Sequence, residues 1–240
     1  MISFIEEYYA IGFRSAEIFA ALVGIIFFKK YKYDKAAKYL IYFLIYVNVI
    51  EVIAHYPTLL QEDKNLKCLK DLLSGTAFLR NYWWYFIAWF IGSNVFFSFY
   101  YYLISESKKI QFYVKYLCFV TVSVQLLLFI LFLRNLDYDF LIYTEVINLV
   151  IILFLVSTYF MQLINSEKLV VFYKTLPFYV TVAAFVFTIT TTPLVFFERY
   201  FNLSDSDYIS LKYVVNFFAI IFMYSLIGIG IIVSEAEVRK

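Results

Sequence analysis

Long apolar segments separated by short charged connections make up most of the chain. About 20 mostly apolar residues in a helix are enough to cross the roughly 30 Å hydrocarbon layer of a bilayer. Runs such as VINLVIILFLV at 146–156 are apolar on every side, which favours helices over the alternating strands of a barrel. Segments of sufficient length lie at 8–28, 38–60, 82–104, 112–133, 140–164, 175–197 and 213–234. The pattern predicts an all-α polytopic integral membrane protein, a seven-transmembrane-helix bundle forming a single domain over residues 1–240.

Composition indicates that lipid, rather than water, surrounds most of the chain. Hydrophobic residues make up 64% and charged residues 16%, with a mean hydropathy of +0.79, whereas soluble domains have roughly 45–50% and about 25%. The 29 Phe and 24 Tyr exclude a disordered chain. The bilayer is therefore the first predicted partner, and a net charge of +2 predicts no nucleic-acid partner. The first charges are Glu6 and Glu7, where a secretory signal would be basic, so the first apolar segment is expected to remain in the mature chain.

Basic residues concentrate in alternate connections. Twelve lie after the first, third and fifth segments and at the C-terminus: Lys29, Lys30, Lys32, Lys35, Lys38, Lys108, Lys109, Lys115, Lys168, Lys174, Arg239 and Lys240. Seven lie on the other side: Lys64, Lys67, Lys70, Arg80, Arg134, Arg199 and Lys212. Because cytoplasmic connections are enriched in Lys and Arg, we expect the N-terminus outside and the C-terminus in the cytoplasm, with the protein in the cytoplasmic (inner) membrane.

Two local patterns predict features of the opposite side. In the connection 61–81, Leu66, Leu69, Leu72 and Leu73 recur at helical spacing. This connection is expected to be either a short amphipathic helix on the outer interface or a structured loop. Pro193 is expected to bend or end the sixth span near its outer end, because proline cannot donate the helical hydrogen bond.

Polar side chains inside the predicted spans are few, so they are the candidate site residues. Charged groups within a membrane are costly and usually face the bundle interior or a wet cavity. Arg14 and Glu17 share one helix face, as do Asn48, Glu51 and His55 on the second span. The full candidate set is Arg14, Glu17, Asn48, Glu51, His55, Asn94, Gln125, Glu145, Asn148 and Asn216. Most are predicted to lie in the outer half, with Asn94 near the middle.

Two interpretations of these residues remain open. In the first, Arg14 pairs with Glu17 or Glu51, and the amides only hydrogen-bond neighbouring helices together. In the second, they line a pocket open to the outside that binds a ligand or a proton. Three carboxylates against one arginine leave an excess of negative charge, so at least one carboxyl is expected to be protonated or paired with a ligand. Arg14, Glu17, Glu51, His55 and Glu145 are expected to converge between the first, second and fifth helices.

The single histidine, His55, excludes several classes of membrane enzyme. Di-iron hydroxylases and zinc hydrolases need several histidine ligands. The sequence has no GxSxG, P-loop, GxGxxG or TVGYG motif. The last span has no mid-span lysine for a retinal Schiff base. No metal or other cofactor is predicted. Cys68 and Cys118 are expected to be free thiols. An acid–base enzyme using Glu51 and His55 is the least expected function.

Three stretches carry a family resemblance: FKKYKYDKAAKYLIYFLIYVNVIE with its acidic Glu51, RNYWWYFI, and KTLPFYV. On these the chain resembles a group of seven-helix membrane proteins of the Bacteroidetes type, from AT-rich bacteria. In that group an acidic residue follows the apolar run of the second span. A polar and aromatic stretch opens the third, as Asn81, Tyr82, Trp83 and Trp84 do here. The resemblance implies a seven-helix fold but no activity, and some such bundles resemble the membrane halves of sensor kinases.

The sequence therefore favours a receptor-like or sensory bundle that binds a small or lipidic ligand in an outward-facing polar pocket. Because the cytoplasmic connections are short, signalling would require a protein partner. A proton-coupled carrier using Glu17, Glu51 and Glu145 is an alternative, although the inner half has few polar residues and no inverted repeat is visible. A membrane effector that permeabilises the bilayer when a partner activates it is another.

Overall fold

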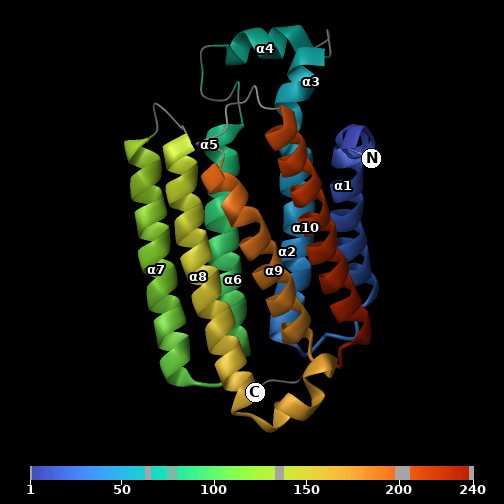
Figure 1. Ribbon diagram of the computed structural model, residues 1–240, viewed down its shortest axis with the longest axis vertical. Helices are drawn as coiled ribbons and strands as arrows, with labels where there is room; N and C mark the ends of the chain where they lie inside the picture. Colours follow the sequence, from blue (N-terminus) through green and yellow to red (C-terminus); the bar gives the residue numbers. More distant parts are fainter. Residues whose placement is uncertain are drawn as a thin grey trace.

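A computed structural model describes residues 2–62, 66–74, 76, 79, 81–132, 138–197 and 206–237. Within this part the chain is helical, and long helical segments run side by side along one axis (Figure 1). The long helices are α1 (Ile2–Ile26), α2 (Lys35–Ala54), α6 (Gly92–Ile104), α7 (Lys108–Leu131), α8 (Tyr138–Ile164), α9 (Leu176–Phe197) and α10 (Ser206–Val233). Shorter elements are α3 (Tyr56–Glu62), α4 (Lys67–Leu73), α5 (Tyr82–Tyr85), the π-helix η3 (Phe86–Ile91) and the 3₁₀-helix η4 (Glu167–Lys174). The two ends of the chain lie at opposite ends of the bundle, which we call the N-terminal end and the C-terminal end.

Six helical segments are long and apolar enough to cross a membrane. They cover Lys35–Gln61, Trp83–Ile104, Lys108–Leu131, Ile142–Ile164, Leu176–Phe197 and Asp207–Val233. They correspond to the second through seventh predicted spans, so six of the predicted apolar helices are confirmed as helices of sufficient length. The first predicted span, 8–28, falls partly on residues whose side chains lie outside the described part of the chain. A crossing by this first span, which would bring the total to seven, therefore stays a prediction, although α1 packs along α10 and α2.

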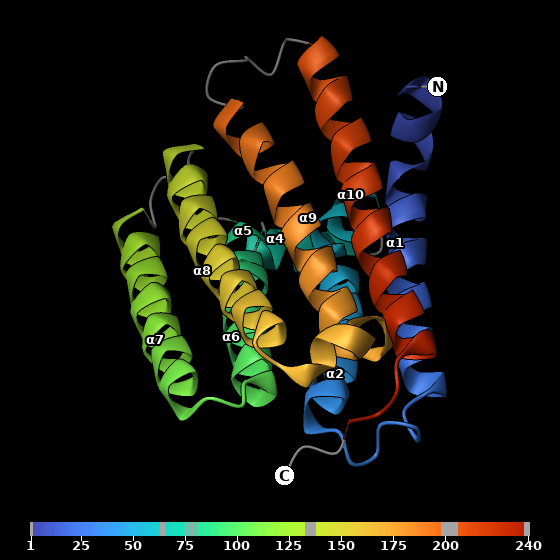
Figure 2. The same cartoon turned by 60° about the horizontal axis from the view of Figure 1, so that its bottom comes forward.

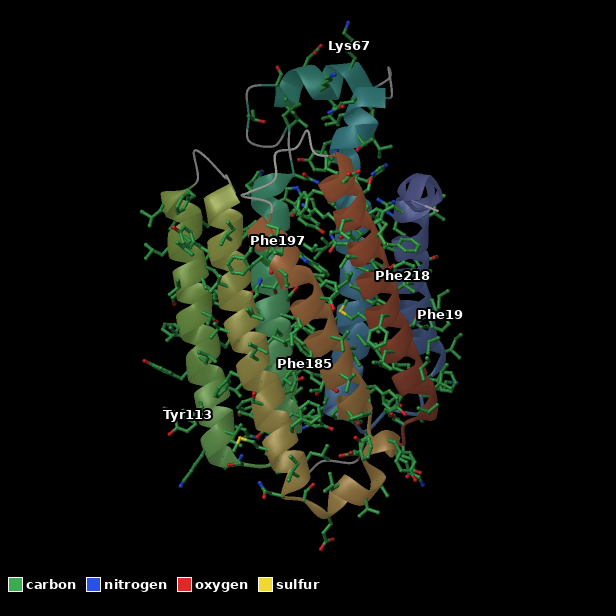
Figure 3. All side chains as sticks on the ribbon, in the orientation of Figure 1. Phe19, Lys67, Tyr113, Phe185, Phe197 and Phe218 are labelled. Atoms are coloured by element: carbon green, nitrogen blue, oxygen red, sulfur yellow. The ribbon has the colours of Figure 1, made fainter. Side chains whose placement is uncertain are left out.

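Small residues allow α1, α2 and α10 to approach closely, as Figure 2 shows for α1 and α10. A Cβ added at Gly24 would lie 3.2 Å from the Ile41 side chain, and one at Gly228 would lie 2.7 Å from the Phe19 ring. Van der Waals packing at such contacts holds membrane helices together, because lipid removes the hydrophobic drive between them. Large apolar side chains such as Phe19, Tyr113 and Phe218 instead cover the outside of the bundle (Figure 3). An apolar exterior of this kind fits contact with a lipid bilayer.

The third predicted span contains a π-helical turn that the sequence pattern did not reveal. The Gly92 backbone N–H bonds to the carbonyls of Ile87, five residues earlier, and of Trp89, and it does not bond to the Ala88 carbonyl four residues earlier. The Tyr46 hydroxyl from α2 donates to this Ala88 carbonyl at 2.9 Å. A Cβ at residue 92 would lie 2.9 Å from the Tyr46 hydroxyl oxygen, so a larger residue there would displace this hydroxyl. The turn, which contains Trp89, is therefore stabilised by a neighbouring helix, and π-helical turns are frequent at functional sites.

The N-terminal end of the bundle decides between the two alternatives for 61–81 and rules out one of the two for Pro193. The connection 61–81 contains the helix α4 rather than only a loop, and α4 lies across the bundle end with no buried residue (Figure 1). Its position on a membrane interface stays a prediction. The sixth span does not end at Pro193, because α9 continues through it to Phe197. Pro193 removes one backbone hydrogen bond, that to the carbonyl four residues earlier, without ending the helix.

The C-terminal end is joined by hydrogen bonds from the connection between α1 and α2. The Tyr31 hydroxyl donates to the carbonyls of Ile231 at 2.8 Å and Ser234 at 3.2 Å. The Lys30 ammonium donates to Ile231 at 3.2 Å and Ile232 at 2.8 Å. Burial raises the pKa of Tyr31, so its hydroxyl stays protonated and able to donate. These contacts hold the last carbonyls of α10, which have no partner inside the helix.

The segment after α10 is also held at this end. Asp34 accepts from the Ala37 backbone N–H at 3.0 Å as the N-cap of α2, and its other oxygen accepts from the Glu237 backbone at 3.4 Å. Lys174 and Glu235 form a salt bridge at 3.1 Å. We call the contacts among Lys30, Tyr31, Asp34, Lys174 and residues 231–237 the C-terminal clasp.

Candidate functional site

A cavity of about 380 Å³ lies inside the bundle, between α1, α2, α6, α8, α9 and α10. Small-molecule sites typically occupy about 300–1,000 Å³, so the volume suits a small ligand. Six of the ten candidate residues line it: Glu17, Glu51, Asn94, Glu145, Asn148 and Asn216. Further lining comes from Tyr85, Trp89, Ser93, Lys212 and Tyr224. Polar groups concentrate toward the N-terminal end, and the part toward the C-terminal end is lined by apolar side chains such as Leu40 and Ile227.

Glu17 and Glu51 form the acidic centre of the cavity. They come from α1 and α2 and lie close enough for their charges to interact. The Tyr85 hydroxyl donates to Glu51 Oε1 at 2.6 Å. The Tyr224 hydroxyl from α10 lies beside Glu17, yet within the described part of the chain it has no partner of hydrogen-bond geometry. Two carboxylates and two phenol groups from four elements therefore meet at one place.

Arg14 does not form the carboxylate ion pair expected from the sequence. Its Nη2 lies 3.5 Å from His55 Nδ1, its buried Nε has no hydrogen-bond partner, and no salt bridge to Glu17 or Glu51 occurs among the described residues. Helical side chains lean toward the helix N-terminus, and the longer arginine extends further in that direction than the glutamate one turn below. Asn48 donates to the backbone carbonyl of Glu17 at 3.3 Å, which joins α2 to α1.

The amides form a second group, which links α6, α7 and α8. Asn94 donates to Thr121 Oγ1 at 3.0 Å and to Gln125 Oε1 at 2.9 Å. Gln125 in turn donates to Asn148 Oδ1 at 2.9 Å, and Ser98 donates to Asn94 at 3.4 Å. Gln125 is fully buried and does not line the cavity. The packing interpretation therefore accounts for Gln125, whereas Asn94 and Asn148 both pack and line the cavity.

Glu145 lines the same cavity from α8 but is separate from the acidic centre. Its carboxylate has no hydrogen bond or ion pair with another described residue, and no contact joins it to Arg14 or His55. The expected convergence of five residues is thus divided into the Arg14–His55 contact, the Glu17–Glu51 centre and Glu145 alone. The predicted last span began at 213, which left Lys212 at its edge. Because α10 begins earlier, at Ser206, Lys212 lies within the helix, and it lines the cavity.

Sequence reasoning missed the aromatic residues of the lining, among them Tyr85, Trp89 and Tyr224. Tyr85 and Trp89 follow the YWW run, and their stacked rings have centroids 6.4 Å apart. The interfacial position of that run pointed to this region but not to a cavity. No sequence pattern pointed to Tyr224, because the chain has 24 tyrosines and the span that contains this one has no charged residue.

The site combines carboxylates and aromatic rings with an apolar continuation. Among the described residues, no group of three or more His, Cys, Asp or Glu side chains could hold a metal ion. Cys68 and Cys118 are free thiols, and neither lines the cavity. No family model, curated protein or solved structure matches this chain. Functional inference therefore depends on the geometry of the cavity.

Proposed function

We propose that the protein is a receptor-like membrane protein that binds a small amphipathic ligand in the central cavity. The observation that carries the proposal is the cavity of about 380 Å³, lined by six of the ten polar residues singled out in the spans. A bundle that used those residues only for packing would bury them against one another. Here Glu17, Glu51 and Glu145 instead face a shared space. A polar part continuous with an apolar part fits a ligand that has a head group and a tail.

The C-terminal clasp gives a route by which binding would be sensed. Asn216, Met223 and Ile227 line the cavity on α10, and one turn beyond Ile227 the same helix reaches Ile231, which Tyr31 and Lys30 hold. A ligand that displaces α10 changes the geometry of these hydrogen bonds. With the N-terminus outside, as the basic residues favour, the clasp lies in the cytoplasm, where a protein partner would contact it.

The clasp also makes the receptor a better candidate than a carrier. A carrier needs a polar route from the cavity to both sides of the membrane. Toward the C-terminal end the described bundle is instead filled by buried side chains such as Tyr31, Leu176 and Ile231. The Tyr101 hydroxyl there is bonded to Thr181 at 2.9 Å. Sustained substrate uptake by reconstituted protein would favour the carrier.

Covalent filling of the cavity tests the coupling to the clasp. A cysteine replaces Asn216, which lines the cavity, in a Cys68→Ser, Cys118→Ser background, and is labelled with a bulky methanethiosulfonate. The matched control carries the cysteine at Phe218, which is exposed on the same helix. We expect the label at 216, but not at 218, to increase backbone amide exchange over 231–237. Equal exchange in both labelled proteins would contradict the receptor function.

A further inference from the structure

We propose that the ligand of the cavity is an amine cation with a short apolar tail, its nitrogen held by Glu17 and Glu51 among aromatic rings. This inference rests on the ligand-binding function proposed above and adds the chemical class of the ligand. Four independent features of the cavity lead to it: its charge, its aromatic rings, its buried polar groups and its apolar end.

The charge of the lining favours a cation. Glu17, Glu51 and Glu145 line the cavity, and Lys212 is the one basic residue among the described lining residues. Arg14 lies outside the lining and contacts His55. Charges in a poorly hydrated interior interact strongly, and an unpaired buried charge is costly. An ammonium would offset the excess of carboxylates, whereas a fatty acid or a phosphate would add to it.

Aromatic rings surround the acidic centre. Tyr9, Tyr85 and Trp89 line the cavity together with the two carboxylates. The hydrogen bond from Tyr85 to Glu51 fixes the Tyr85 ring, and its stacking on Trp89 fixes the second ring. The faces of Tyr and Trp rings attract ammonium groups, and cages of this kind recognise amine ligands. Rings and carboxylates at one place therefore favour an organic cation over a proton or a metal ion.

Two buried side chains at this centre, Glu17 and Tyr224, lie beside each other and line the cavity, so that one bound amine would reach both. Glu17 is 5% exposed and Tyr224 is 2% exposed, and both line the cavity. The Tyr224 hydroxyl has no hydrogen-bond partner within the described chain. Buried polar groups are normally hydrogen-bonded. The N–H groups of an amine in the adjoining cavity would donate to the Glu17 carboxylate and to the Tyr224 oxygen.

The remainder of the cavity suits a hydrocarbon tail. Toward the C-terminal end it is lined by Leu44, Ile152, Met223 and Ile227. Burial of a tail there is favourable by about 0.8 kcal/mol for each methylene removed from water. The ammonium therefore lies toward the N-terminal end and the tail toward the clasp.

Quenching of tryptophan fluorescence by brominated ligands tests the proposal. The chain has three tryptophans, so a Trp83→Phe, Trp84→Phe variant leaves Trp89 on the cavity wall as the single reporter. In phosphatidylcholine nanodiscs at neutral pH it is titrated with ω-bromooctylamine, ω-bromooctanol or ω-bromooctanoate. We expect saturable quenching by the amine, with half-quenching at a concentration about tenfold or more below that of the alcohol and the acid.

Two substitutions locate the ammonium, and one serves as the matched control. Glu17→Gln and Glu51→Gln, each in the Trp89-only variant, should raise the half-quenching concentration of the amine about tenfold or more. Glu167→Gln, at an exposed carboxylate on η4, should leave it unchanged. If either cavity variant does not fold, the comparison of the three ligands on the unmodified carboxylates still decides the result.

The outcomes separate this inference from the proposed function. If the alcohol or the acid saturates at the same concentration as the amine, or if both glutamine variants match their parent, the amine assignment is wrong while the cavity remains a ligand site. If all three ligands quench only in proportion to their concentration in the lipid, the ligand site itself is contradicted. Saturation by the amine alone, lost in the glutamine variants, supports both.

Discussion

Gln125→Leu removes a side chain that joins three helices by hydrogen bonds. Gln125 is 0% exposed and bonds Asn94 on α6 and Asn148 on α8, both at 2.9 Å, from its own position on α7. Leucine has a similar volume, so the substitution removes the two bonds without creating a large cavity. It therefore isolates the contribution of the amide group to the attachment of α7.

The expected loss follows from the two bonds. Interhelical hydrogen bonds in membrane proteins contribute about 0.6 kcal/mol on average and at most about 1.7 kcal/mol. Asn94 keeps its bond to Thr121 at 3.0 Å, which limits the cost of losing Gln125. We therefore expect the free energy of unfolding to fall by about 1–2 kcal/mol. This loss is closer to the sum of two hydrogen bonds of average strength than to the sum of two of maximal strength.

Equilibrium unfolding in mixed micelles with increasing dodecyl sulfate measures this loss. Ser123→Ala is the matched control on α7, because Ser123 is exposed and bonds only the Phe119 carbonyl of its own helix, at 2.8 Å. Its loss should stay below about 0.5 kcal/mol, as for most surface changes. A loss for Gln125→Leu no larger than that of Ser123→Ala would refute the view that the amides hold α7 in place.

Three further substitutions and conditions give distinct expectations. Tyr46→Phe leaves the Ala88 carbonyl of the π-helical turn without its donor, and we expect a loss of about 1–2 kcal/mol in the same unfolding assay. Glu145→Gln removes a charge that has no described partner, so thermal unfolding should occur at the same or a higher temperature. The hydrogen bond with Glu235 raises the pKa of Lys174 above its usual 10.5. From neutral pH up to about 10.5 the Lys174 ammonium stays charged and the salt bridge is complete, and it is lost as the pH rises through the raised pKa. Amide protection over 231–237, corrected for the intrinsic exchange rate, should fall there.

Each expectation has its own control. Tyr42→Phe, at an exposed tyrosine with no hydrogen bond to a described residue, should cost less than about 0.5 kcal/mol, and an equal cost for Tyr46→Phe would contradict the role of the π-helical turn. Glu167→Gln shows the effect of removing an exposed charge, and a clear decrease in the unfolding temperature for Glu145→Gln alone would indicate an unrecognised partner. Lys174→Gln should abolish the alkaline change in protection, and an unchanged pH profile would exclude the salt bridge as its cause.

Hydropathy predicted the positions of the helices well, because the length and apolarity of a membrane helix are properties of the segment itself. The third predicted span, 82–104, coincides with the run of α5, η3 and α6. The π-helical turn within it could not be predicted, because it depends on the Tyr46 hydroxyl, which comes from another helix. Likewise, the helix α4 was one of two alternatives, since a short amphipathic pattern does not distinguish a helix from a loop.

The candidate site was predicted as a set of residues but not as an arrangement. Costly polar groups in a membrane had to face inward, and six of the ten do line one cavity. Their partners depend on helix rotation and side-chain length, which spacing does not determine. Arg14 therefore contacts His55 instead of a carboxylate, and Glu145 lies apart from Glu17. The aromatic part of the site was hidden because aromatic residues are 23% of the sequence.

The accessibility of two adjacent positions on α9 tests the central claim, that the polar residues face a cavity which a ligand can enter. Thr188 lines the cavity, and its neighbour Ile189 is exposed on the apolar surface. Spin labels at Thr188→Cys and Ile189→Cys, in nanodiscs, are compared for collision with a water-soluble nickel chelate and with oxygen dissolved in lipid. We expect the label at 188 to respond mainly to the nickel chelate and the label at 189 mainly to oxygen. If the label at 188 responds only to oxygen, or to neither, the cavity is not an accessible binding site.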